Sequence, residues 1–309
     1  KRGNPRQRPP FPANKGLFDK PTTLNNVETW SIVPQIILKG ADWYKGIGVG
    51  ANSGTKTFCL VGKITNSGIA EVPVGTPLGH VVFDIGGGPP KGKSFKSVQI
   101  GGPSGGVIPI EHINTPVDYE SVTSLGAIMG SGGLIVMDED SCMVDMAKFF
   151  LQFTKDESCG KCLPCREGLK RMREILDRIV SGKGEEGDLE ILRETAALMK
   201  DASLCALGRT AVNPVLSTMA YFPEEYSAHI RQKRCPSLSC KALVSYSIQP
   251  ERCIGCGQCL KNCPSKAISE EGEVCVIDQS LCSRCGICFD VCPPKARAVN
   301  KTSRGDGGR

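Results

Sequence analysis

The run Cys253-Ile-Gly-Cys256-Gly-Gln-Cys259-Leu-Lys-Asn-Cys263-Pro264 recurs later in the chain as Cys282-Ser-Arg-Cys285-Gly-Ile-Cys288-Phe-Asp-Val-Cys292-Pro293. Each run has the spacing C-x2-C-x2-C-x3-C followed by proline. A zinc module and a disulfide framework are the plainer interpretations. Zinc sites usually pair C-x2-C units across a longer gap, however, so the repeated run of four thiols favours metal clusters.

This spacing is typical of bacterial two-cluster ferredoxins, in which the fourth cysteine of each run binds the other cluster. It predicts a two-cluster ferredoxin domain over residues 243–300, with a disordered tail at 301–309. One [4Fe–4S] cluster is expected on Cys253, Cys256, Cys259 and Cys292. The second is expected on Cys282, Cys285, Cys288 and Cys263.

The composition agrees with a metal-loaded protein. The chain has 309 residues, 17 of them cysteine, and no signal-peptide pattern. So many thiols in such a chain predict reduced, metal-bound cysteines and a cytoplasmic location. No run of eighteen apolar residues is present, which predicts no membrane span. The net charge of +6 comes partly from the basic chain ends Lys1-Arg2, Arg6, Arg8, Arg304 and Arg309, and no nucleic-acid motif accompanies it.

The first part of the chain divides into two predicted regions. Residues 1–48 begin without methionine in a Pro/Gly/Arg-rich segment, which indicates an N-terminally truncated domain, and a helix is expected from about Asn26 to Lys39. Residues 49–140 form a predicted β-grasp domain, ubiquitin-like in fold. Its expected strands are 57–62, 69–74, 97–102 and 134–137, with a short helix at 77–85. The glycine-rich stretches 101–106 and 130–133 match no phosphate-loop pattern and are interpreted as tight turns.

Residues 141–242 have helical periodicity. Apolar stripes follow 144–151, 169–180 and 189–199, and Asn213-Pro214 is expected to cap a further helix. Four helices with short connections predict a four-helix bundle. The fold class is therefore α+β and multidomain.

A third cysteine motif lies between two of these helices. Cys159, Cys162 and Cys165 have the spacing C-x2-C-x2-C, and a [4Fe–4S] cluster needs a fourth thiolate. Cys205 follows the third predicted helix and is the expected fourth ligand. Zinc and a redox-active C-x2-C pair are the alternatives for this motif.

The surroundings of this motif resemble a known family. Residues 8–29, with Asn25-Asn26-Val27-Glu28-Thr29, and residues 157–168, with Glu157-Ser158-Cys159-Gly160, resemble the NADH-binding flavoprotein subunit of complex I. With the ferredoxin repeat added, the chain is most similar to diaphorase subunits of soluble NAD(P)-linked or electron-bifurcating [FeFe]-hydrogenases, or of related formate dehydrogenases.

The resemblance implies a flavin site. In this family a nicotinamide, NAD or NADP, exchanges hydride with FMN, which passes single electrons to the nearby cluster. It implies that Asn25, Asn26, Ala206 and Leu207 approach FMN, with most of the FMN and nicotinamide site upstream of this sequence. The alternative for the asparagines is a helix cap. It also implies a soluble-ligand-binding-like β-grasp domain.

Five cysteines remain after these assignments. Cys59 and Cys275 lie in apolar strands and are expected in cores. Cys235 and Cys240 follow His229 at zinc-compatible spacing, and Cys142 is the candidate fourth ligand. The hydrogenase subunits that the chain resembles carry such a site, so structural zinc is one interpretation and four unligated side chains are the other.

The predicted function is the electron-transfer portion of an NAD(P)H-oxidising diaphorase subunit. No nucleophile–base constellation is present, so no catalytic residue is assigned. The implied partners are a [2Fe–2S] thioredoxin-like subunit and a hydrogenase or formate dehydrogenase subunit, with no nucleic acid and no membrane span. The rival interpretation is an iron–sulfur wiring and docking module without flavin or nicotinamide activity of its own.

Overall fold

A computed structural model describes residues 8–50 and 52–304 of the chain. The basic residues Lys1, Arg2, Arg6 and Arg309 of the two ends therefore lie outside the described residues. The chain forms two compact units. The first unit consists of 1–139, 149–172 and 193–221, and the second of 140–148, 173–192 and 222–309. No helix of the described residues is long and apolar enough to cross a membrane.

The first unit begins with a helical segment. A 3-10 turn, η1 (Leu17–Asp19), precedes helix α1 (Val27–Lys39), helix α2 (Ala41–Lys45) and a small hairpin of β1 (Gly48–Val49) and β2 (Asn52–Ser53). The Asn26 side chain accepts a hydrogen bond from the Glu28 N–H at 3.3 Å and so caps α1. The helix predicted from about Asn26 to Lys39 is confirmed to within one residue.

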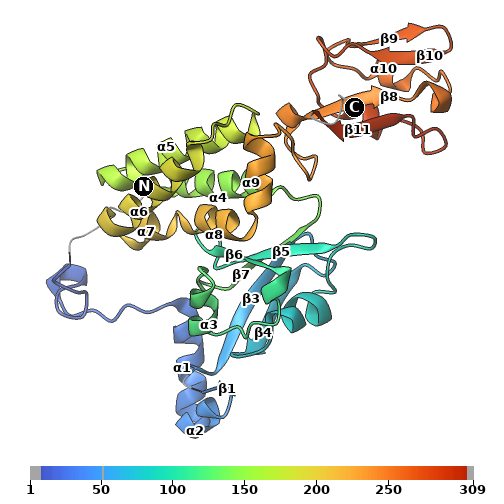
Figure 1. The fold of residues 1–309 in the computed structure, drawn as a ribbon. Helices are drawn as coiled ribbons and strands as arrows, with labels where there is room; N and C mark the ends of the chain where they lie inside the picture. Colours follow the sequence, from blue (N-terminus) through green and yellow to red (C-terminus); the bar gives the residue numbers. More distant parts are fainter. Residues whose placement is uncertain (1–7, 51, 305–309) are drawn as a thin grey trace. The chain divides into compact units, whose positions relative to one another are not determined.

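A five-stranded sheet forms the body of the first unit (Figure 1). Its strands are β3 (Thr55–Gly62), β4 (Gly68–Pro73), β5 (Phe95–Ile100), β6 (Gly106–Pro109) and β7 (Gly133–Asp138). The order across the sheet is β4-β3-β7-β5-β6; β3 and β7 are parallel and the other neighbours are antiparallel. Three short helical elements lie in the connections between the strands. They are η2 (His80–Ile85), between β4 and β5, and η3 (Ile110–His112) and α3 (Tyr119–Ser124), between β6 and β7.

The alternating burial of side chains along β3 contradicts the prediction for Cys59. Phe58 and Leu60 are buried in the apolar core of the sheet, whereas Cys59 between them is exposed. Successive side chains of a strand point to opposite faces, so Cys59 lies on the open face of the sheet. Its predicted place in a core was wrong.

The glycine-rich stretches are tight turns, as predicted. Gly101, Gly102, Gly130 and Gly132 all have positive φ. At Gly132, where φ is +88, a Cβ would collide with the Thr57 carbonyl oxygen. Only glycine lets the backbone approach β3 this closely at the start of β7.

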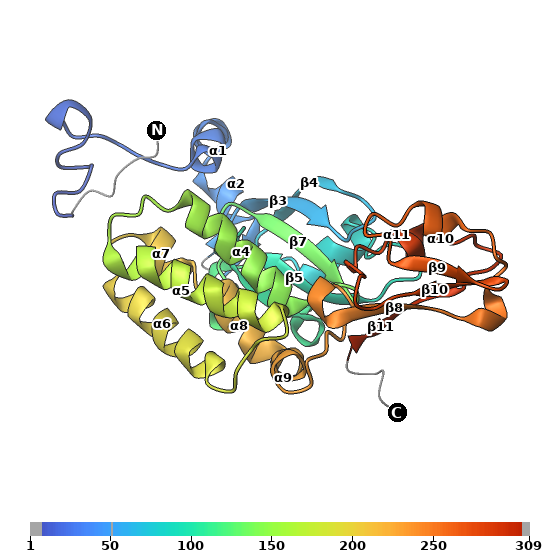
Figure 2. The same cartoon turned by 90° about the horizontal axis from the view of Figure 1, so that it is seen from above.

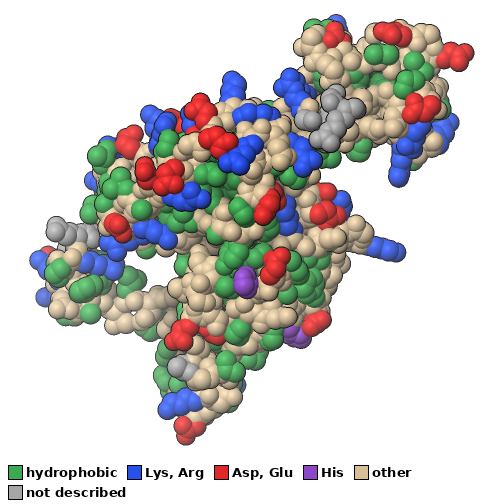
Figure 3. Space-filling view, viewed as in Figure 1, with side chains coloured by type: hydrophobic (Ala, Val, Ile, Leu, Met, Phe, Trp, Pro, Cys, Tyr) green, Lys and Arg blue, Asp and Glu red, His purple; other side chains and the backbone are tan. Residues whose placement is uncertain are grey.

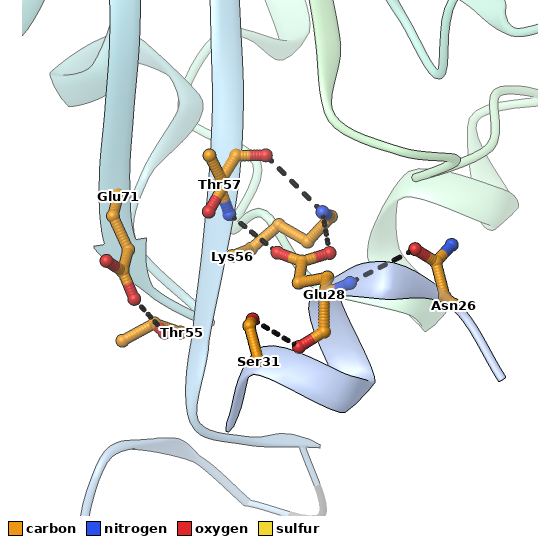
Figure 4. A network of polar contacts seen from close by, with 7 residues as sticks. All are labelled: Asn26, Glu28, Ser31, Thr55, Lys56, Thr57 and Glu71. Carbon is orange, nitrogen blue, oxygen red and sulfur yellow. Dashed lines mark hydrogen bonds and ion pairs between the residues drawn. The ribbon is translucent and has the colours of Figure 1, made fainter. Parts of the chain in front are cut away.

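A partly buried ion pair joins α1 to β3 (Figure 4). The side chain of Lys56 is 3% exposed, and its ammonium donates to the Glu28 carboxylate. The other carboxylate oxygen of Glu28 accepts from the Thr57 N–H at 2.9 Å. Burial raises the pKa of Glu28, but the hydrogen bonds from Lys56 and Thr57 outweigh it and hold the pKa below the usual 4.5.

Six helices follow the sheet: α4 (Met143–Glu157), α5 (Leu163–Val180), α6 (Asp188–Ala202), α7 (Ala206–Thr210), α8 (Asn213–Tyr221) and α9 (Pro223–Ile230). Four of them were predicted, and the short helices α7 and α9 were not. The apolar stripes are buried, as amphipathic helices require: Ala147, Leu151, Met172, Ile175, Leu176, Leu192, Ala196 and Met199 are all 0% exposed.

The predicted cap of α8 is displaced by one residue. The helix begins at Asn213, whose side-chain amide donates to the Ser104 carbonyl instead of capping. Ser217 of the same helix accepts from the Val107 N–H of β6 at 3.0 Å. These bonds attach α8 to the sheet within the first unit.

The C-terminal part of the second unit contains two small antiparallel sheets of two strands each, together with short helices (Figure 2). Its elements are η4 (Lys241–Leu243), β8 (Val244–Ile248), η5 (Pro250–Arg252), α10 (Gln258–Lys261), β9 (Ile268–Glu271), β10 (Val274–Ile277), α11 (Ile287–Asp290) and β11 (Val299–Ser303). β8 pairs with β11 and β9 with β10, both antiparallel. Cys275 lies in the core here, as predicted.

Residues 301–303, which were predicted to belong to a disordered tail, are part of strand β11. Lys301 pairs with Tyr246, and Ser303 with Val244, in the ladder of β8 and β11. The prediction was wrong for these residues because β8, far away in sequence, supplies their backbone partners. Residues 305–309 lie outside the described residues.

We predict that Glu28→Gln destabilises the first unit by about 2 kcal/mol, because it leaves the Lys56 ammonium buried without its carboxylate. The two tryptophans of the chain, Trp30 and Trp43, lie in α1 and α2, so urea unfolding followed by tryptophan fluorescence measures this effect. The folded-state pKa of Glu28 is lowered. Its contribution is therefore present above about pH 4.5 and is lost as the pH falls through the lower folded value.

The control is Glu71→Gln on β4, where an amide oxygen still accepts from Thr55. It should leave the urea midpoint unchanged. Equal midpoints for Glu28→Gln and Glu71→Gln at neutral pH would contradict the stabilising role of the partly buried pair.

Candidate metal centres

The first ferredoxin group is Cys253, Cys256, Cys259 and Cys292. All four line one cavity of about 320 Å³, together with Ile248, Pro293, Ala296 and Ala298. Three of the cysteines come from the loop before α10 and its first turn, and Cys292 comes from the segment after α11. The structure thus brings together the set that the sequence predicted, including the cysteine from the other run.

The second ferredoxin group is Cys263, Cys282, Cys285 and Cys288. These four line a separate cavity of about 290 Å³, with Tyr246, Ser265, Ile268, Ile277 and Gly286. Cys263 comes from the first run and the other three from the second. The similar sizes of the two cavities and the exchanged fourth cysteine agree with the predicted pair of four-thiol sites.

Backbone N–H groups point at the sulfurs of these groups. Ala267 donates to Cys263 Sγ at 3.3 Å, Ala298 to Cys292 Sγ at 3.2 Å, and Arg284 to Cys282 Sγ at 3.4 Å. Gly257 and Gly286 have left-handed φ values, +63 and +85, directly before α10 and α11. This conformation turns the chain sharply between the second and third cysteines of each run.

The helical-region group is Cys159, Cys162, Cys165 and Cys205. Burial raises the pKa of the Cys165 thiol, and the nearby thiolates of Cys162, Cys205 and Cys159 raise it further. All four sulfurs are thus close enough to interact electrostatically. The four cysteines lie in the first unit, as the ligands of one cluster must.

Close packing brings Cys205 to the other three. A Cβ on Gly208 of α7 would lie 2.6 Å from Ser203 Oγ and 3.1 Å from Cys165 Cβ. Glycine is therefore needed where α7 approaches the start of α5. On the loop itself, Arg166 donates to the Gly160 carbonyl at 2.9 Å, and Gly160 has φ +71.

The residues expected near FMN lie in two places of the first unit. Asn26 caps α1, which is the alternative that the sequence left open, and Asn25 directly precedes it. Ala206 and Leu207 form the first turn of α7, immediately after Cys205. A helix cap accounts for the hydrogen bond of Asn26, so a flavin role for these residues stays a prediction.

The Cys3His group is Cys142, His229, Cys235 and Cys240, all buried in the second unit. Their ligand atoms lie within 4.8 Å of one another. His229 Nε2 is 3.4 Å from Cys142 Sγ and 3.3 Å from Cys240 Sγ, and the two sulfurs are 3.7 Å apart. The structure therefore brings together all four residues of the predicted zinc set.

These distances fit a tetrahedral zinc ion. Zn–S bonds of about 2.3 Å and a Zn–N bond of about 2.0–2.1 Å give a tetrahedron with S–S edges of about 3.8 Å and S–N edges of about 3.6 Å. The three distances given above agree with these edges to within about 0.3 Å. Three thiols and one imidazole, all buried, are a usual donor set of closed structural zinc sites.

Hydrogen bonds that involve Glu225 hold His229 and the segment next to Cys142 in position. His229 Nδ1 is 2.7 Å from the Glu225 carbonyl oxygen, so Nδ1–H donates and leaves Nε2 toward the thiols. The Glu225 carboxylate accepts from the Met143 N–H, next to Cys142, at 3.0 Å. Sequence analysis did not identify Glu225. Its position four residues before His229, on the same face of α9, is the signal that was available.

The four side chains share protons when no metal is bound. Hydrogen bonds with Cys142 and Cys240 lower the pKa of the Cys235 thiol, and the bond to Cys235 raises the pKa of Cys142. Burial lowers the pKa of His229, but hydrogen bonds to Cys142 and Cys235 raise it to about 10. A bound zinc ion replaces these protons, because metal ligands bind in their deprotonated forms.

Known proteins match both regions that hold cysteine groups. Residues 145–229 match the iron–sulfur binding region of NADH-ubiquinone oxidoreductase-F, and residues 246–269 and 275–297 match a 4Fe-4S binding domain. The chain is 55% identical over 269 residues to the HndC subunit of the NADP-reducing hydrogenase of Solidesulfovibrio fructosivorans, covering 87% of this chain and 55% of that protein. It is 42% identical over 236 residues to the F 2 subunit of the NADH-quinone oxidoreductase of Rhizobium meliloti, covering 76% of this chain and 56% of that one.

A solved structure agrees with these matches. The NAD+-reducing [NiFe]-hydrogenase in its H2-reduced state superposes with a TM-score of 0.68 at 34% identity, over 74% of this chain and 38% of that chain. The chain spans about half the length of the curated relatives it matches. The predicted family resemblance is confirmed: over most of its length the chain is similar to the F subunits of NADH-quinone oxidoreductases and to their hydrogenase counterparts.

Proposed function

We propose that the chain is the electron-transfer portion of an NAD(P)H-linked diaphorase subunit, with three [4Fe–4S] clusters. The observation that carries this proposal is the grouping of twelve cysteines into three sets of four, two of them in separate cavities. Clusters held by four thiolates supply one-electron carriers. The protein residues would hold them and direct N–H groups at their sulfurs.

The proposed layout has four parts. They are a flavin-domain end at 1–48, a β-grasp domain at 49–140, a helical bundle at 141–242 and a ferredoxin domain from 243 to about 304. Numbered within the sheet, the strand order β4-β3-β7-β5-β6 reads 2-1-5-3-4 with strands 1 and 5 parallel, the arrangement of a ubiquitin-like β-grasp fold. α5 and α6 pack closely at Gly168 and Met199, which supports the bundle.

The proposed flavin and nicotinamide chemistry follows from the relatives. The names of the relatives mention NADP reduction, NADH–quinone oxidoreduction and NAD+ reduction. We propose that FMN, near Asn25, Asn26, Ala206 and Leu207, exchanges electrons with the cluster on the helical-region group. The proposed partners are other subunits of a cytoplasmic redox complex, including a [2Fe–2S] thioredoxin-like subunit and a hydrogenase or formate dehydrogenase subunit.

We propose that zinc occupies the Cys3His group and has a structural role. The residues come from the start of α4, from α9 and from the segment that leads to β8. All four ligands are protein side chains and all are buried, so no open position is left for substrate. Zinc here fixes the start of α4 to the segment before the ferredoxin domain.

The cluster assignment predicts the iron content. The anaerobically prepared chain should contain about twelve iron atoms and as many sulfides, four for each cluster. Cys205→Ala should reduce the iron content to about eight, because three thiolates of the helical-region group do not hold a [4Fe–4S] cluster. Iron and sulfide analysis with EPR of the dithionite-reduced protein measures this change.

The matched control is Cys59→Ala, which removes an exposed cysteine outside all four groups. It should retain about twelve irons. A Cys205→Ala protein that keeps the full iron content would remove Cys205 from the site. Most of the flavin and nicotinamide site is expected upstream of this sequence, so the diaphorase is distinguished from a wiring module with a protein that includes the upstream region. Anaerobic addition of NADH or NADPH with FMN to that protein should reduce the clusters only if it is a diaphorase.

The zinc assignment predicts about one zinc ion per chain, lost in His229→Ala. The loss follows because three buried thiols without the imidazole leave the tetrahedral site incomplete. Native mass spectrometry of the reduced protein measures the bound zinc. His80→Ala, which changes an exposed histidine outside the group, is the control and should retain the metal. Zinc absent from the unmodified chain would refute the assignment.

A further inference from the structure

The two ferredoxin groups have closely related surroundings. In each half the fourth cysteine is followed by proline and, two positions later, by lysine, Lys266 or Lys295. In each half the residue before a strand donates its N–H to that cysteine: Ala267 to Cys263 at 3.3 Å and Ala298 to Cys292 at 3.2 Å. These shared contacts affect both sites alike, so any difference between the sites comes from positions where the halves diverge.

The first divergent position is Ser265, which corresponds to Pro294. Ser265 Oγ lies 3.6 Å from Cys263 Sγ. An iron-bound thiolate has no proton, so the hydroxyl must be the donor when the site is loaded. Pro294 has neither a hydroxyl nor an N–H, so the first ferredoxin group lacks this donor.

The second divergent position is Arg284, which corresponds to Gly255. Both have left-handed backbones, with φ +55 and +63. A Cβ on Gly255 would lie 2.7 Å from the Glu273 carbonyl oxygen, so that half requires glycine. Arg284 stands between Cys282 and Cys285 in the sequence, and its backbone N–H donates to Cys282 Sγ. Its Nε is buried and has no hydrogen-bond partner among the described residues.

The first ferredoxin group has a weaker hydrogen-bond donor and a nearby negative charge in place of these features. A Cβ on Gly257, in its loop, would lie 3.4 Å from Glu270 Oε1, so a carboxylate lies beside this loop. The thiol of Cys275 donates to Cys259, and a thiol is a weak donor. Arg252, which precedes Cys253, is exposed and bonded to Gln249. Basic and acidic side chains both appear on the face of this C-terminal part that Figure 3 shows.

Hydrogen bonds and cations near the sulfurs favour the reduced state of a cluster. Reduction adds one electron to the cluster, without making or breaking a bond, and so adds one negative charge. Donors and cations stabilise that charge and raise the reduction potential. The backbone N–H groups of Leu260 and Phe289 act on the equivalent cysteines Cys259 and Cys288. Beyond this shared pair, the second ferredoxin group has Ser265, Ala267 and Arg284 as donors, while the first has Ala298 and the weak donor Cys275.

We propose that the cluster on Cys263, Cys282, Cys285 and Cys288 has the higher reduction potential of the two and is reduced first, and that Ser265 and Arg284 set the difference. The inference rests on the proposed function, since it requires that both ferredoxin groups hold clusters. If the proposal is correct, a single electron in the ferredoxin domain is held mainly by the cluster of the second group.

The test is an anaerobic redox titration of the full chain, with dithionite as reductant and EPR as readout. Two matched variants assign each reduction step to its cluster. Cys256→Ser and Cys285→Ser each replace an exposed cysteine at the same position of the two runs. The step that moves or disappears in Cys256→Ser belongs to the first group, and the step that does so in Cys285→Ser belongs to the second. The proposal requires the second to have the higher midpoint.

Two further variants test the residues that set the difference. Ser265→Ala should lower the reduction equilibrium constant of the second cluster about tenfold, which is about 59 mV for a one-electron couple, and leave the first unchanged. Arg284→Gly should lower the same step, since glycine suits the left-handed backbone and keeps the N–H donor but removes the cation. Ser269→Ala, which changes an exposed serine of β9, is the control and should shift neither step.

The outcomes separate this inference from the proposed function. If the iron and sulfide content corresponded to one cluster instead of three, the cluster assignment itself would be overturned. Full iron content with the lower midpoint on the second group would overturn only the inference. Full iron content with the expected order, but no shift in Ser265→Ala and Arg284→Gly, would overturn the roles of these two residues.

Discussion

The need of each iron–sulfur site for four thiolates controls the C-terminal part of this molecule. Each run of the repeat supplies three cysteines to its own cavity and one to the other, so neither site is complete until both runs are in place. With clusters bound, Cys263 and Cys292 would cross-link the two halves, much as disulfides do in secreted domains. The β8–β11 ladder and the β9–β10 hairpin are short and share one small apolar core.

The same requirement explains the local backbone. Left-handed residues, Gly255, Gly257, Arg284 and Gly286, recur between the cysteines because three thiols from one short loop must converge. In the helical region, Gly160 and Gly208 have the corresponding roles, one in the loop and one where α7 meets the start of α5. Glycine thus occupies most of these positions, where a left-handed backbone or a close approach leaves little room for a side chain.

Spacing made most of the metal sites predictable. Cysteines at fixed short intervals have few ways to bind one metal, so the ferredoxin groups, Cys205 and the Cys3His group followed from the sequence. Features that depend on a distant partner did not follow. Cys59 was misplaced because an apolar run does not reveal which face of a strand is covered, and the end of β11 was missed because its partner is β8. The ion pair of Glu28 with Lys56 was not predicted, because the sequence around Glu28 does not indicate that a buried lysine of β3 lies next to it.

The pairing of β8 with β11 also bears on how such a chain is assembled in evolution. Val244, at the start of the ferredoxin region, lies opposite Ser303, at its end. A region whose two ends meet is attached to its neighbours at a single place, and such regions are readily inserted, exchanged or lost as a block. Because the β8–β11 ladder brings its two ends together, the ferredoxin region could be inserted into another protein as one unit.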